Sequence, residues 1–252
     1  MSNKYYGAIN LGGNLKAPIR LKDILEFGTD RTYTTYFFEN KKSEINALCD
    51  KFHTDKGGFD PKEKTYPWGS HNYAYFYDDL FSHIRPYVRN LFEFGLGTNN
   101  TAFEDNMTVN GSPGASLRMW KEYFPLATIA GADIDRDVLF QEERINTAYV
   151  DQLNPATFEA LWAAHENTEF DIIVDDGLHT FEAGICTFEN SFHKLRAGGI
   201  YIIEDVRNTS PVEFLNYFKG RPNFNFQIVQ LNRTNGSRAD CLVVIRKPYG
   251  EA

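Results

Sequence analysis

Two apolar segments that each end in a pair of acids constrain this sequence most. The first is FDIIVDDGLH, at Phe170–His179, which predicts a buried strand that stops at Asp175 and Asp176. The second is GGIYIIEDV, which comes later in the chain and predicts a strand that ends at Glu204 and Asp205. Ligands of open α/β sheets bind in the crevice beyond the carboxyl ends of the strands. The two segments therefore predict an α/β sheet with a charged site at that edge.

The acids at these two strand ends suit a divalent cation. If the strands are neighbours, their ends lie roughly 5 Å apart, which brings Asp175 or Asp176 close to Glu204 and Asp205. Crowded carboxylates repel one another, and an all-oxygen set suits Mg²⁺, Mn²⁺ or Ca²⁺ better than Zn²⁺. His179 follows the first pair and is a candidate general base. The alternative is that the acids cap the following helices; two pairs and a histidine together favour a functional site.

A glycine-containing turn follows the first predicted core strand, Asn90–Phe94. The turn, EFGLG, contains Glu93, Gly95 and Gly97. In nucleoside-binding units, glycines at this turn let the backbone approach the ligand, and an acid there can accept a hydrogen bond from a ligand amine or hydroxyl. The alternative is a tight turn without a ligand, and the glycines alone do not decide between the two.

Polar residues also end the next two predicted strands. Asp133 closes ATIAGADID, where a dinucleotide-binding unit holds the ribose hydroxyls, and Asp135 is the second candidate for that role. The strand INTAYVDQ then brings Asp151 and Gln152 to the same edge. Contact with a base ring is one interpretation of this pair, and a solvated turn is the other. The sequence thus predicts a nucleoside site beside the acids.

Composition limits the class of protein. Of the 252 residues, 42% are hydrophobic, which is enough for one sizeable α/β domain with an appendage. A net charge of −8 argues against nucleic acid as a partner, because proteins that bind phosphate backbones carry clustered Lys and Arg. The sequence contains neither a signal peptide nor an apolar run of the roughly 18 residues that a membrane span needs, so we expect a cytoplasmic protein without a membrane partner. The three cysteines have neither disulfide nor metal-ligand spacing.

The chain divides into residues 1–43, an accessory segment, and residues 44–252, the main domain. The accessory segment is rich in aromatic residues and contains one strand-like alternation, RTYTTYFFEN. Exposed aromatic residues at this density usually have a partner. We therefore expect this segment to pack on the domain or on a second subunit, as in a homo-oligomer.

Local patterns predict the other elements. A helix is expected over SEINALCDKF with Ser43 as its N-cap, and another over Asn72–Tyr87. The long polar connection at 98–113 is predicted to form a lid or to contact substrate. Asn235 and Gly236 predict the turn of a closing antiparallel hairpin. Further helices are predicted over 114–124, 180–195 and 211–220.

Taken together, the motifs EFGLG, GASLRMW, GADID, VDQ, VDDGLH and GGIYIIEDV, with TDKG upstream, resemble the class I S-adenosylmethionine-dependent methyltransferases. Within that class, the pattern is most similar to the metal-dependent sugar O-methyltransferases of macrolide biosynthesis, the mycinamicin type. The resemblance covers residues 50–248. It implies a Rossmann-like α/β fold: a seven-stranded, mostly parallel sheet with a C-terminal antiparallel hairpin and helices on both faces.

The resemblance also implies roles for the residues selected above. It implies a Mg²⁺ ion, or another hard divalent cation, held by Asp176, Glu204 and Asp205, with His179 as the base, so that Asp176 and His179 are the catalytic candidates. Two features depart from the family pattern: the insert at 98–113 and the first forty residues. The residues implied to contact S-adenosylmethionine are Glu93, Gly95, Gly97, Asp133, Asp151, Gln152 and Asp175.

The activity implied is methyl transfer to a sugar hydroxyl of a nucleotide sugar, a capsular polysaccharide precursor or a glycosylated metabolite. A phosphate or phosphoramidate group of a capsule precursor is the alternative acceptor, whose charge Lys56, Lys62, Lys64 and Arg207 could meet. A non-heme iron oxygenase is less favoured, because only one histidine is predicted near the acids and no H-x-D is present. A non-catalytic nucleoside-binding subunit is the third alternative.

Overall fold

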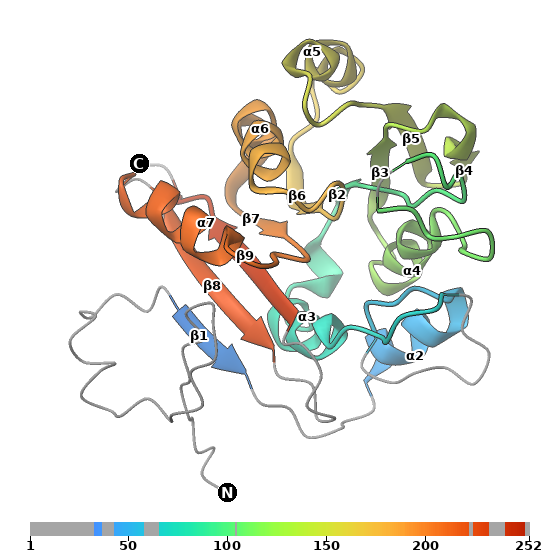
Figure 1. Cartoon of the computed structure of the whole chain (residues 1–252), viewed down its shortest axis with the longest axis horizontal. Helices are drawn as coiled ribbons and strands as arrows, with labels where there is room; N and C mark the ends of the chain where they lie inside the picture. The colour runs from blue at the N-terminus through green and yellow to red at the C-terminus, as the bar shows by residue number, and fades with distance from the viewer. Residues whose placement is uncertain are drawn as a thin grey trace, which may run out of the picture.

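The computed structural model describes residues 33–36, 43–57, 66–103, 105–221, 224–231 and 240–249. Within them, one nine-stranded sheet has the order β1-β8-β9-β7-β6-β2-β3-β5-β4 (Figure 1). The strands are β1 (Tyr33–Tyr36), β2 (Asn90–Phe94), β3 (Thr128–Asp133), β4 (Gln141–Glu142), β5 (Ile145–Tyr149), β6 (Phe170–Asp175), β7 (Leu195–Ile203), β8 (Asn225–Leu231) and β9 (Asp240–Arg246).

The sheet is mostly parallel, as predicted, but it has more strands than the seven expected. Strand β9 is antiparallel to β7 and β8, and β4 is antiparallel to β5, while the other pairs are parallel. The two additional strands lie at the edges. Strand β4 has only two residues, too few to show an alternation. Strand β1 comes from the predicted accessory segment and pairs with β8, so this part of the segment joins the main sheet. The predicted turn at Asn235–Gly236 lies outside the described residues.

Six α-helices cover the described part of the sheet, with three short 3-10 turns between them. The helix predicted over 72–87 ends at Phe81, because Pro86 lacks an N–H group and its ring would clash with the carbonyl four residues earlier. The helices are α2 (Glu44–Phe52), α3 (Tyr73–Phe81), α4 (Ala115–Tyr123), α5 (Pro155–Ala163), α6 (Phe181–Ser191) and α7 (Ser210–Lys219).

Helix ends follow local capping signals. Ser43 caps α2 as predicted, with its hydroxyl accepting a hydrogen bond from the Asn46 backbone N–H. Helix α5 was missed by the sequence analysis. Asn154 caps it, and Pro155 occupies its first turn, which together form a recognisable start signal.

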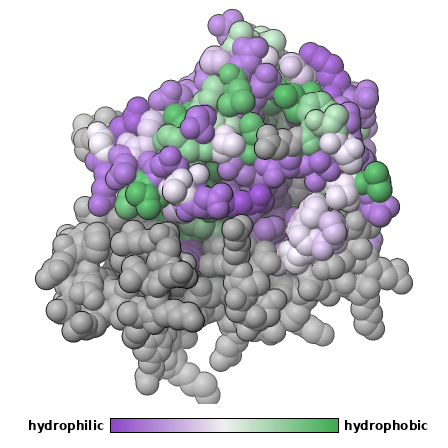
Figure 2. All heavy atoms as spheres, in the orientation of Figure 1, coloured by the Kyte–Doolittle hydropathy of each residue, from purple (hydrophilic) through white to green (hydrophobic). Residues whose placement is uncertain are grey.

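Two hydrophobic clusters fill the space on either side of the sheet. Strand residues alternate between them: Leu91 of β2 packs with residues of α2, α3 and α4, whereas the adjacent Phe92 packs with residues of α5, α6 and α7. The two helix groups accordingly lie on opposite sides of the sheet (Figure 1). On the face shown in Figure 2, hydrophilic residues predominate and hydrophobic residues form small groups. Among the described helices, none is long and apolar enough to cross a membrane.

Strand order places the acids of the sequence at one point. Strand β2 lies between β3 and β6. The next strands along the chain, β3 to β5, lie on one side of β2, and the later strands, from β6 on, lie on the other side. Such a reversal creates a crevice at the carboxyl ends of the strands, where open α/β sheets bind ligands. Phe94 pairs with Asp175, and Asp175 pairs with Ile203, so the ends of β2, β6 and β7 are adjacent there.

Candidate functional site

The glycine turn after β2 fits against two other segments of the chain. Gly95 has φ 84°, and a Cβ atom there would lie 2.0 Å from the carbonyl oxygen of Asp176. Gly97 has φ 78°, and a Cβ atom there would lie 2.0 Å from Sδ of Met107. Both positions therefore require glycine. The sequence predicted that these glycines admit a ligand, whereas the structure brings the loop after β6 and the insert at 98–113 against them.

The side chain of Gln152 holds the loop after β6. Its Nε2 donates to Oδ1 of Asp175 at 2.6 Å and to the hydroxyl of Thr187 at 2.9 Å. Its Oε1 accepts from the Leu178 N–H at 2.8 Å. A Cβ atom on Gly177 would lie 1.9 Å from this Oε1 atom, so any larger residue there would displace the Gln152 amide from its hydrogen bonds. The predicted contact of Gln152 with a base ring stays a prediction; the hydrogen bonds that the structure gives it are to the chain.

Asp175 is buried and only half paired. It is 4% exposed, and its Oδ2 atom has no hydrogen-bond partner among the described residues. Burial raises the pKa of this carboxyl to about 7.

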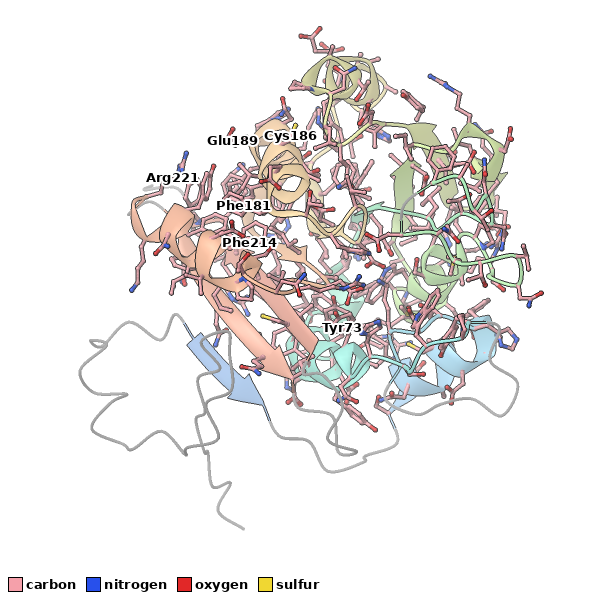
Figure 3. The ribbon with its side chains drawn as sticks, viewed as in Figure 1. Tyr73, Phe181, Cys186, Glu189, Phe214 and Arg221 are labelled. Atoms are coloured by element: carbon pink, nitrogen blue, oxygen red, sulfur yellow. The ribbon has the colours of Figure 1, made fainter. Side chains whose placement is uncertain are left out.

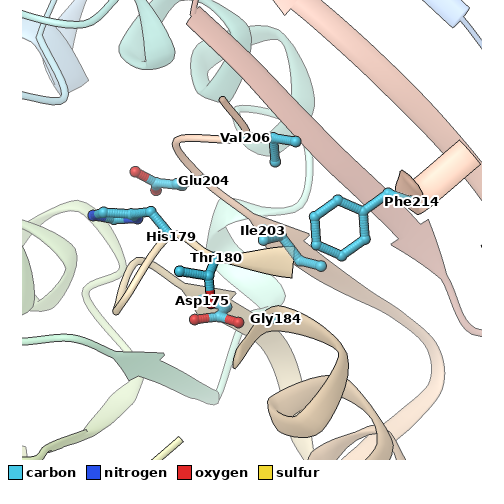
Figure 4. Close-up of a pocket in the computed structure, with 8 residues that line it drawn as sticks. All are labelled: Asp175, His179, Thr180, Gly184, Ile203, Glu204, Val206 and Phe214. Atoms are coloured by element: carbon cyan, nitrogen blue, oxygen red, sulfur yellow. The ribbon is translucent and has the colours of Figure 1, made fainter. Parts of the chain in front are cut away.

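Asp175 lines a small pocket at the ends of β6 and β7 (Figure 4). The pocket is lined by Asp175, His179, Thr180, Gly184, Ile203, Glu204, Val206 and Phe214. Aromatic contact between Phe181 and Phe214, with ring centroids 5.0 Å apart, joins α6 to α7 beside it (Figure 3).

Three of the predicted residues form a cluster that could hold a metal ion. One ligand atom from each of Asp176, His179 and Asp205 lies within 4.8 Å of the others. His179 and Asp205 have φ angles of 57° and 51°, a left-handed conformation that is unusual for residues other than glycine. Strained residues of this kind concentrate at functional sites. The structure thus brings the DDGLH motif and the second acid pair together, as the sequence predicted.

Asp205 is surrounded by donors and cations. The hydroxyl of Tyr73 donates to its Oδ1 at 2.6 Å, and Arg207 donates to its Oδ2 at 2.7 Å. Nε2 of His179 lies 3.7 Å from Oδ2, and Nδ1 of His71 lies 3.6 Å from Oδ1. Burial alone would raise the pKa of Asp205, but His71, His179 and Arg207 hold it well below its usual range. The prediction of only one histidine near the acids was wrong, because His71 reaches them from the start of α3.

Glu204 is buried beside that cluster and lines the same pocket as His179. Its Oε1 accepts from the Tyr77 hydroxyl at 2.6 Å and its Oε2 from the Lys56 ammonium at 2.7 Å. Lys56 also donates to Asp176 at 2.6 Å and lies 3.5 Å from Glu93. Although burial lowers the pKa of Lys56, the carboxylates of Asp176, Glu204 and Glu93 raise it well above its usual value. Lys56 was one of the residues predicted to meet the charge of a phosphate-bearing acceptor; it is only 1% exposed and is bonded to these acids. Lys62 and Lys64, predicted for the same role, lie outside the described residues.

The remaining predicted cofactor residues lie at the ends of β2, β3 and β5, but they already have partners in the chain. Glu93 is fully buried and accepts from the Trp120 indole N–H at 2.5 Å. Asp133 accepts from the backbone N–H groups of Leu96, at 2.7 Å, and Asp135, at 2.8 Å. Asp151 accepts from the N–H of Leu153 at 2.9 Å. Carboxylate oxygens can accept more than one hydrogen bond, so Asp133 and Asp151 stay candidates for ligand contact.

Four residues that contact the acids of the site come from a part of the sequence where no contact with these acids was predicted. Their side chains meet acids more than a hundred positions away: Lys56 and Asp176 are 120 residues apart, and Tyr73 and Asp205 are 132. The TDKG motif, which contains Lys56, was the one sequence signal for this region. The residues are Lys56, His71, Tyr73 and Tyr77.

Comparison with known proteins gives relatives in one functional group, although no family model matches the chain. Over 142 residues it is 32% identical to the 8-demethyl-8-alpha-L-rhamnosyl tetracenomycin-C 2'-O-methyltransferase of Streptomyces olivaceus, which covers 56% of this chain and 35% of the relative. Over 175 residues it is 32% identical to demethylmacrocin O-methyltransferase of Streptomyces fradiae, which covers 68% of this chain and 42% of the relative. The chain therefore spans less than half the length of these relatives.

Solved structures show the same likeness. The MycE methyltransferase from the mycinamycin biosynthetic pathway, in complex with Mg and SAH, aligns with a TM-score of 0.55 at 25% identity, over 84% of this chain and 55% of that chain. The O-methyltransferase TomG of Streptomyces achromogenes, in complex with SAM, aligns with a TM-score of 0.51 at 14% identity, over 82% of this chain and 91% of that chain. At this identity, the likeness to TomG concerns the fold alone.

The strand order, the strand-end site and these alignments define the class: the chain has the fold of the class I S-adenosylmethionine-dependent methyltransferases. Within that class it resembles the sugar O-methyltransferases of macrolide biosynthesis, including the mycinamicin type, as its motifs predicted.

Proposed function

We propose that this protein transfers a methyl group from S-adenosylmethionine to a sugar hydroxyl, with the help of a divalent cation. The observation that carries the proposal is the cluster of Asp176, His179 and Asp205 at the strand ends. Its combination of hard oxygen ligands and a histidine suits activation of a hydroxyl group. The named relatives, which are O-methyltransferases of glycosylated natural products, support the same chemistry.

The crevice beside the cluster suits the cofactor. The unpaired Oδ2 atom of Asp175 is a buried acceptor at the point where the strand order reverses. S-adenosylmethionine carries an ammonium group and ribose hydroxyls, which are donors of the kind such an atom requires. Asp133 and Asp151, at the ends of the next two strands, are the proposed contacts for the ribose and the adenine. The backbone turn at Gly95 and Gly97 is proposed to lie beside the methionine end of the cofactor.

The divalent cation fits the cluster of Asp176, His179 and Asp205. Asp176 and Asp205 supply carboxylate oxygens, and the pKa of Asp205 is held low, so it is charged across the physiological range. Glu204 stays the third proposed ligand; its two oxygens accept hydrogen bonds from Lys56 and Tyr77. A bound Mg²⁺ ion would lower the pKa of a coordinated hydroxyl and fix its orientation.

His179 is the proposed proton acceptor. Its Nε2 atom lies 3.7 Å from Asp205 Oδ2, so the ring stands at the acid cluster, where it could take a proton from an acceptor hydroxyl. The oxygen then attacks the methyl carbon, the carbon–sulfur bond breaks, and its electron pair stays on sulfur. A general base contributes about 10²- to 10⁴-fold in rate, and alignment of the two substrates contributes much of the remainder.

A glycosylated metabolite is the acceptor class that the comparisons favour. The named relatives act on a rhamnosyl tetracenomycin, demethylmacrocin, an olivosyl-oleandolide and a mycinamicin. No comparison supports a nucleotide sugar or a capsule precursor as the acceptor. We therefore treat these two acceptors only as alternatives to a glycosylated metabolite. A phosphate-bearing acceptor has one feature in its favour: Arg207 is 43% exposed beside Asp205.

The test is isothermal titration of S-adenosylmethionine into metal-stripped protein, followed by titration of Mg²⁺ into that complex. We expect both to bind, and we expect Asp176→Asn to lose Mg²⁺ binding while Asp79→Asn, an exposed acid on α3, retains it. Product formation is then measured with a panel of glycosides, nucleotide sugars and sugar phosphates. Absence of cofactor binding would refute the proposal. Cofactor binding with turnover that His179→Ala leaves unchanged would remove the histidine from the mechanism, and binding without turnover on any acceptor would favour a non-catalytic subunit.

A further inference from the structure

The insert at 98–113 is a compact loop that begins and ends beside the glycine turn. Its two ends meet through the Gly114 N–H group, which donates to the carbonyl oxygen of Leu96 at 2.7 Å. Within the loop, Nδ2 of Asn99 donates to the carbonyl oxygen of Thr108 at 2.6 Å. A loop whose ends are close and whose side chains bond its own backbone keeps a defined shape. The insert therefore presents its outer side chains from fixed positions.

Asp105 links this insert to the acid cluster. Its φ of 53° is left-handed, a conformation in which aspartate is enriched relative to most residues. Its Oδ1 atom lies 3.5 Å from Nη1 of Arg207. Nη2 of the same guanidinium group donates to Oδ2 of Asp205 at 2.7 Å. Arg207 thus bridges two carboxylates, one in the insert and one in the loop after β7.

The oxygen that Arg207 holds is the one that faces the proposed cation site. Nε2 of His179 lies 3.7 Å from Oδ2 of Asp205, whereas the hydroxyl of Tyr73 donates to Oδ1 at 2.6 Å. Asp176, His179 and Asp205 offer the atoms of the cluster. A divalent cation among these atoms would lie close to the guanidinium group, and like charges repel. Binding of the cation would therefore drive Arg207 away from Asp205.

Asp105 offers the displaced guanidinium group a second partner. The side chains of Arg207 and Asp105 are 43% and 34% exposed, so Arg207 can turn without disturbing buried packing. An exposed ion pair contributes little to stability, and the loss of one changes an equilibrium constant by about twofold to fivefold. The expected effect of Asp105 on metal binding is of this size.

We propose that Asp105 is a positioning residue of the metal site, which takes Arg207 from Asp205 when a divalent cation binds. Arg207 then ties the insert to the loaded site, so that binding of the cation is coupled to the stability of the insert. This inference rests on the proposed function, in which a divalent cation binds at Asp205.

The test is isothermal titration of Mg²⁺ into the full-length, metal-stripped protein with S-adenosylmethionine bound. We expect Asp105→Asn to weaken Mg²⁺ binding by about twofold to fivefold, and Arg207→Gln, which removes the competing cation, to strengthen it. In the Arg207→Gln background, Asp105→Asn should leave the affinity unchanged, because Asp105 acts through Arg207. The matched control is Asp137→Asn, an exposed acid after β3, whose affinity should equal that of the wild type.

The double variant excludes a trivial explanation. Removal of any negative charge near the site weakens the attraction for a cation through space. If Asp105→Asn weakens Mg²⁺ binding equally with and without Arg207, this through-space effect is the cause and the inference is overturned.

Hydrogen exchange of the insert provides a second readout that does not depend on turnover. The amide groups of Met107 and Thr108 bond to Thr98 O, at 2.7 Å, and to Asn106 Oδ1, at 3.0 Å. Saturating Mg²⁺ should slow their exchange in the wild type and leave it unchanged in Asp105→Asn. Equal exchange of the wild type with and without Mg²⁺ would refute the coupling.

The outcomes separate the two proposals. Mg²⁺ binding that is equally tight in the wild type and in Asp105→Asn leaves the proposed function intact and refutes the inference. Absence of Mg²⁺ binding by the wild type would refute the inference together with metal dependence, while methyl transfer itself would still be judged by product formation.

Discussion

Replacement of Gln152 by alanine should destabilise the protein by about 4 kcal/mol. The side chain makes two hydrogen bonds to neutral groups, Thr187 and Leu178, and one to the carboxylate of Asp175. A neutral bond contributes about 1 kcal/mol and a bond to a charged group about 1.5–3 kcal/mol. The substitution also removes the one side-chain hydrogen bond that the buried Asp175 carboxyl makes among the described residues and leaves it the backbone N–H of Gly177.

The assay is thermal denaturation followed by far-UV circular dichroism at pH 7, with urea denaturation to give the free energy of unfolding. For a protein of this size, about 4 kcal/mol corresponds to a fall of about 8–16 °C in the thermal midpoint. The control is Gln141→Ala, since Gln141 is an exposed glutamine on β4, and surface substitutions usually change stability by less than about 0.5 kcal/mol.

The result also decides between two roles of Gln152. A loss of less than about 1 kcal/mol, accompanied by weaker binding of S-adenosylmethionine, would refute the reasoning. Gln152 would then contact the cofactor, as the sequence predicted, and its hydrogen bonds to the loop after β6 would be of minor importance.

Three further predictions concern the same edge of the sheet. Burial raises the pKa of Asp175 to about 7, so the folded protein binds more protons than the unfolded chain between about pH 4 and about pH 7. The stability that comes from this extra proton is lost as the pH rises through that window. Asp175→Asn should therefore flatten the dependence of unfolding free energy on pH there. Asp205→Asn should weaken Mg²⁺ binding at least tenfold in isothermal titration of the complex with S-adenosylmethionine, and equal affinity would exclude Asp205 as a ligand. Gly177→Ala should destabilise the protein, because the new Cβ atom would lie 1.9 Å from Gln152 Oε1. When Gln152 is also replaced by alanine, most of that loss of stability should disappear. If the stability losses of the two single variants simply add in the double variant, the clash with Gln152 is not the cause.

Much of the fold follows from local pattern. The strand at Asn90–Phe94 was predicted with the bounds that the structure has, and the helix after Ser43 was predicted with its cap. Such elements depend on the period of apolar residues and on capping groups a few positions away, which are present in any short window of sequence. Strand β4 and helix α5 were missed, the first because it has only two residues and the second although Asn154 and Pro155 marked its start.

The partners of the two acids after β7 were not predictable in this way. The sequence places Glu204 and Asp205 together and predicts both as metal ligands. In the structure the oxygens of Glu204 are bonded to Lys56 and Tyr77, while Asp205, at φ 51°, lies near His179 and His71. These partners come from distant parts of the chain, so no pattern of neighbouring residues specifies them.

The sequence by itself determined the class of sheet, the acids at the strand ends and, through its motifs, the methyltransferase resemblance, because each of these is written in neighbouring residues. Only the tertiary structure decided which of these groups are paired. Lys56, His71, Tyr73 and Tyr77 reach the acids across more than a hundred residues of chain. The partners of a buried charge are set by how helices α2 and α3 pack on the sheet, and no local pattern specifies that packing.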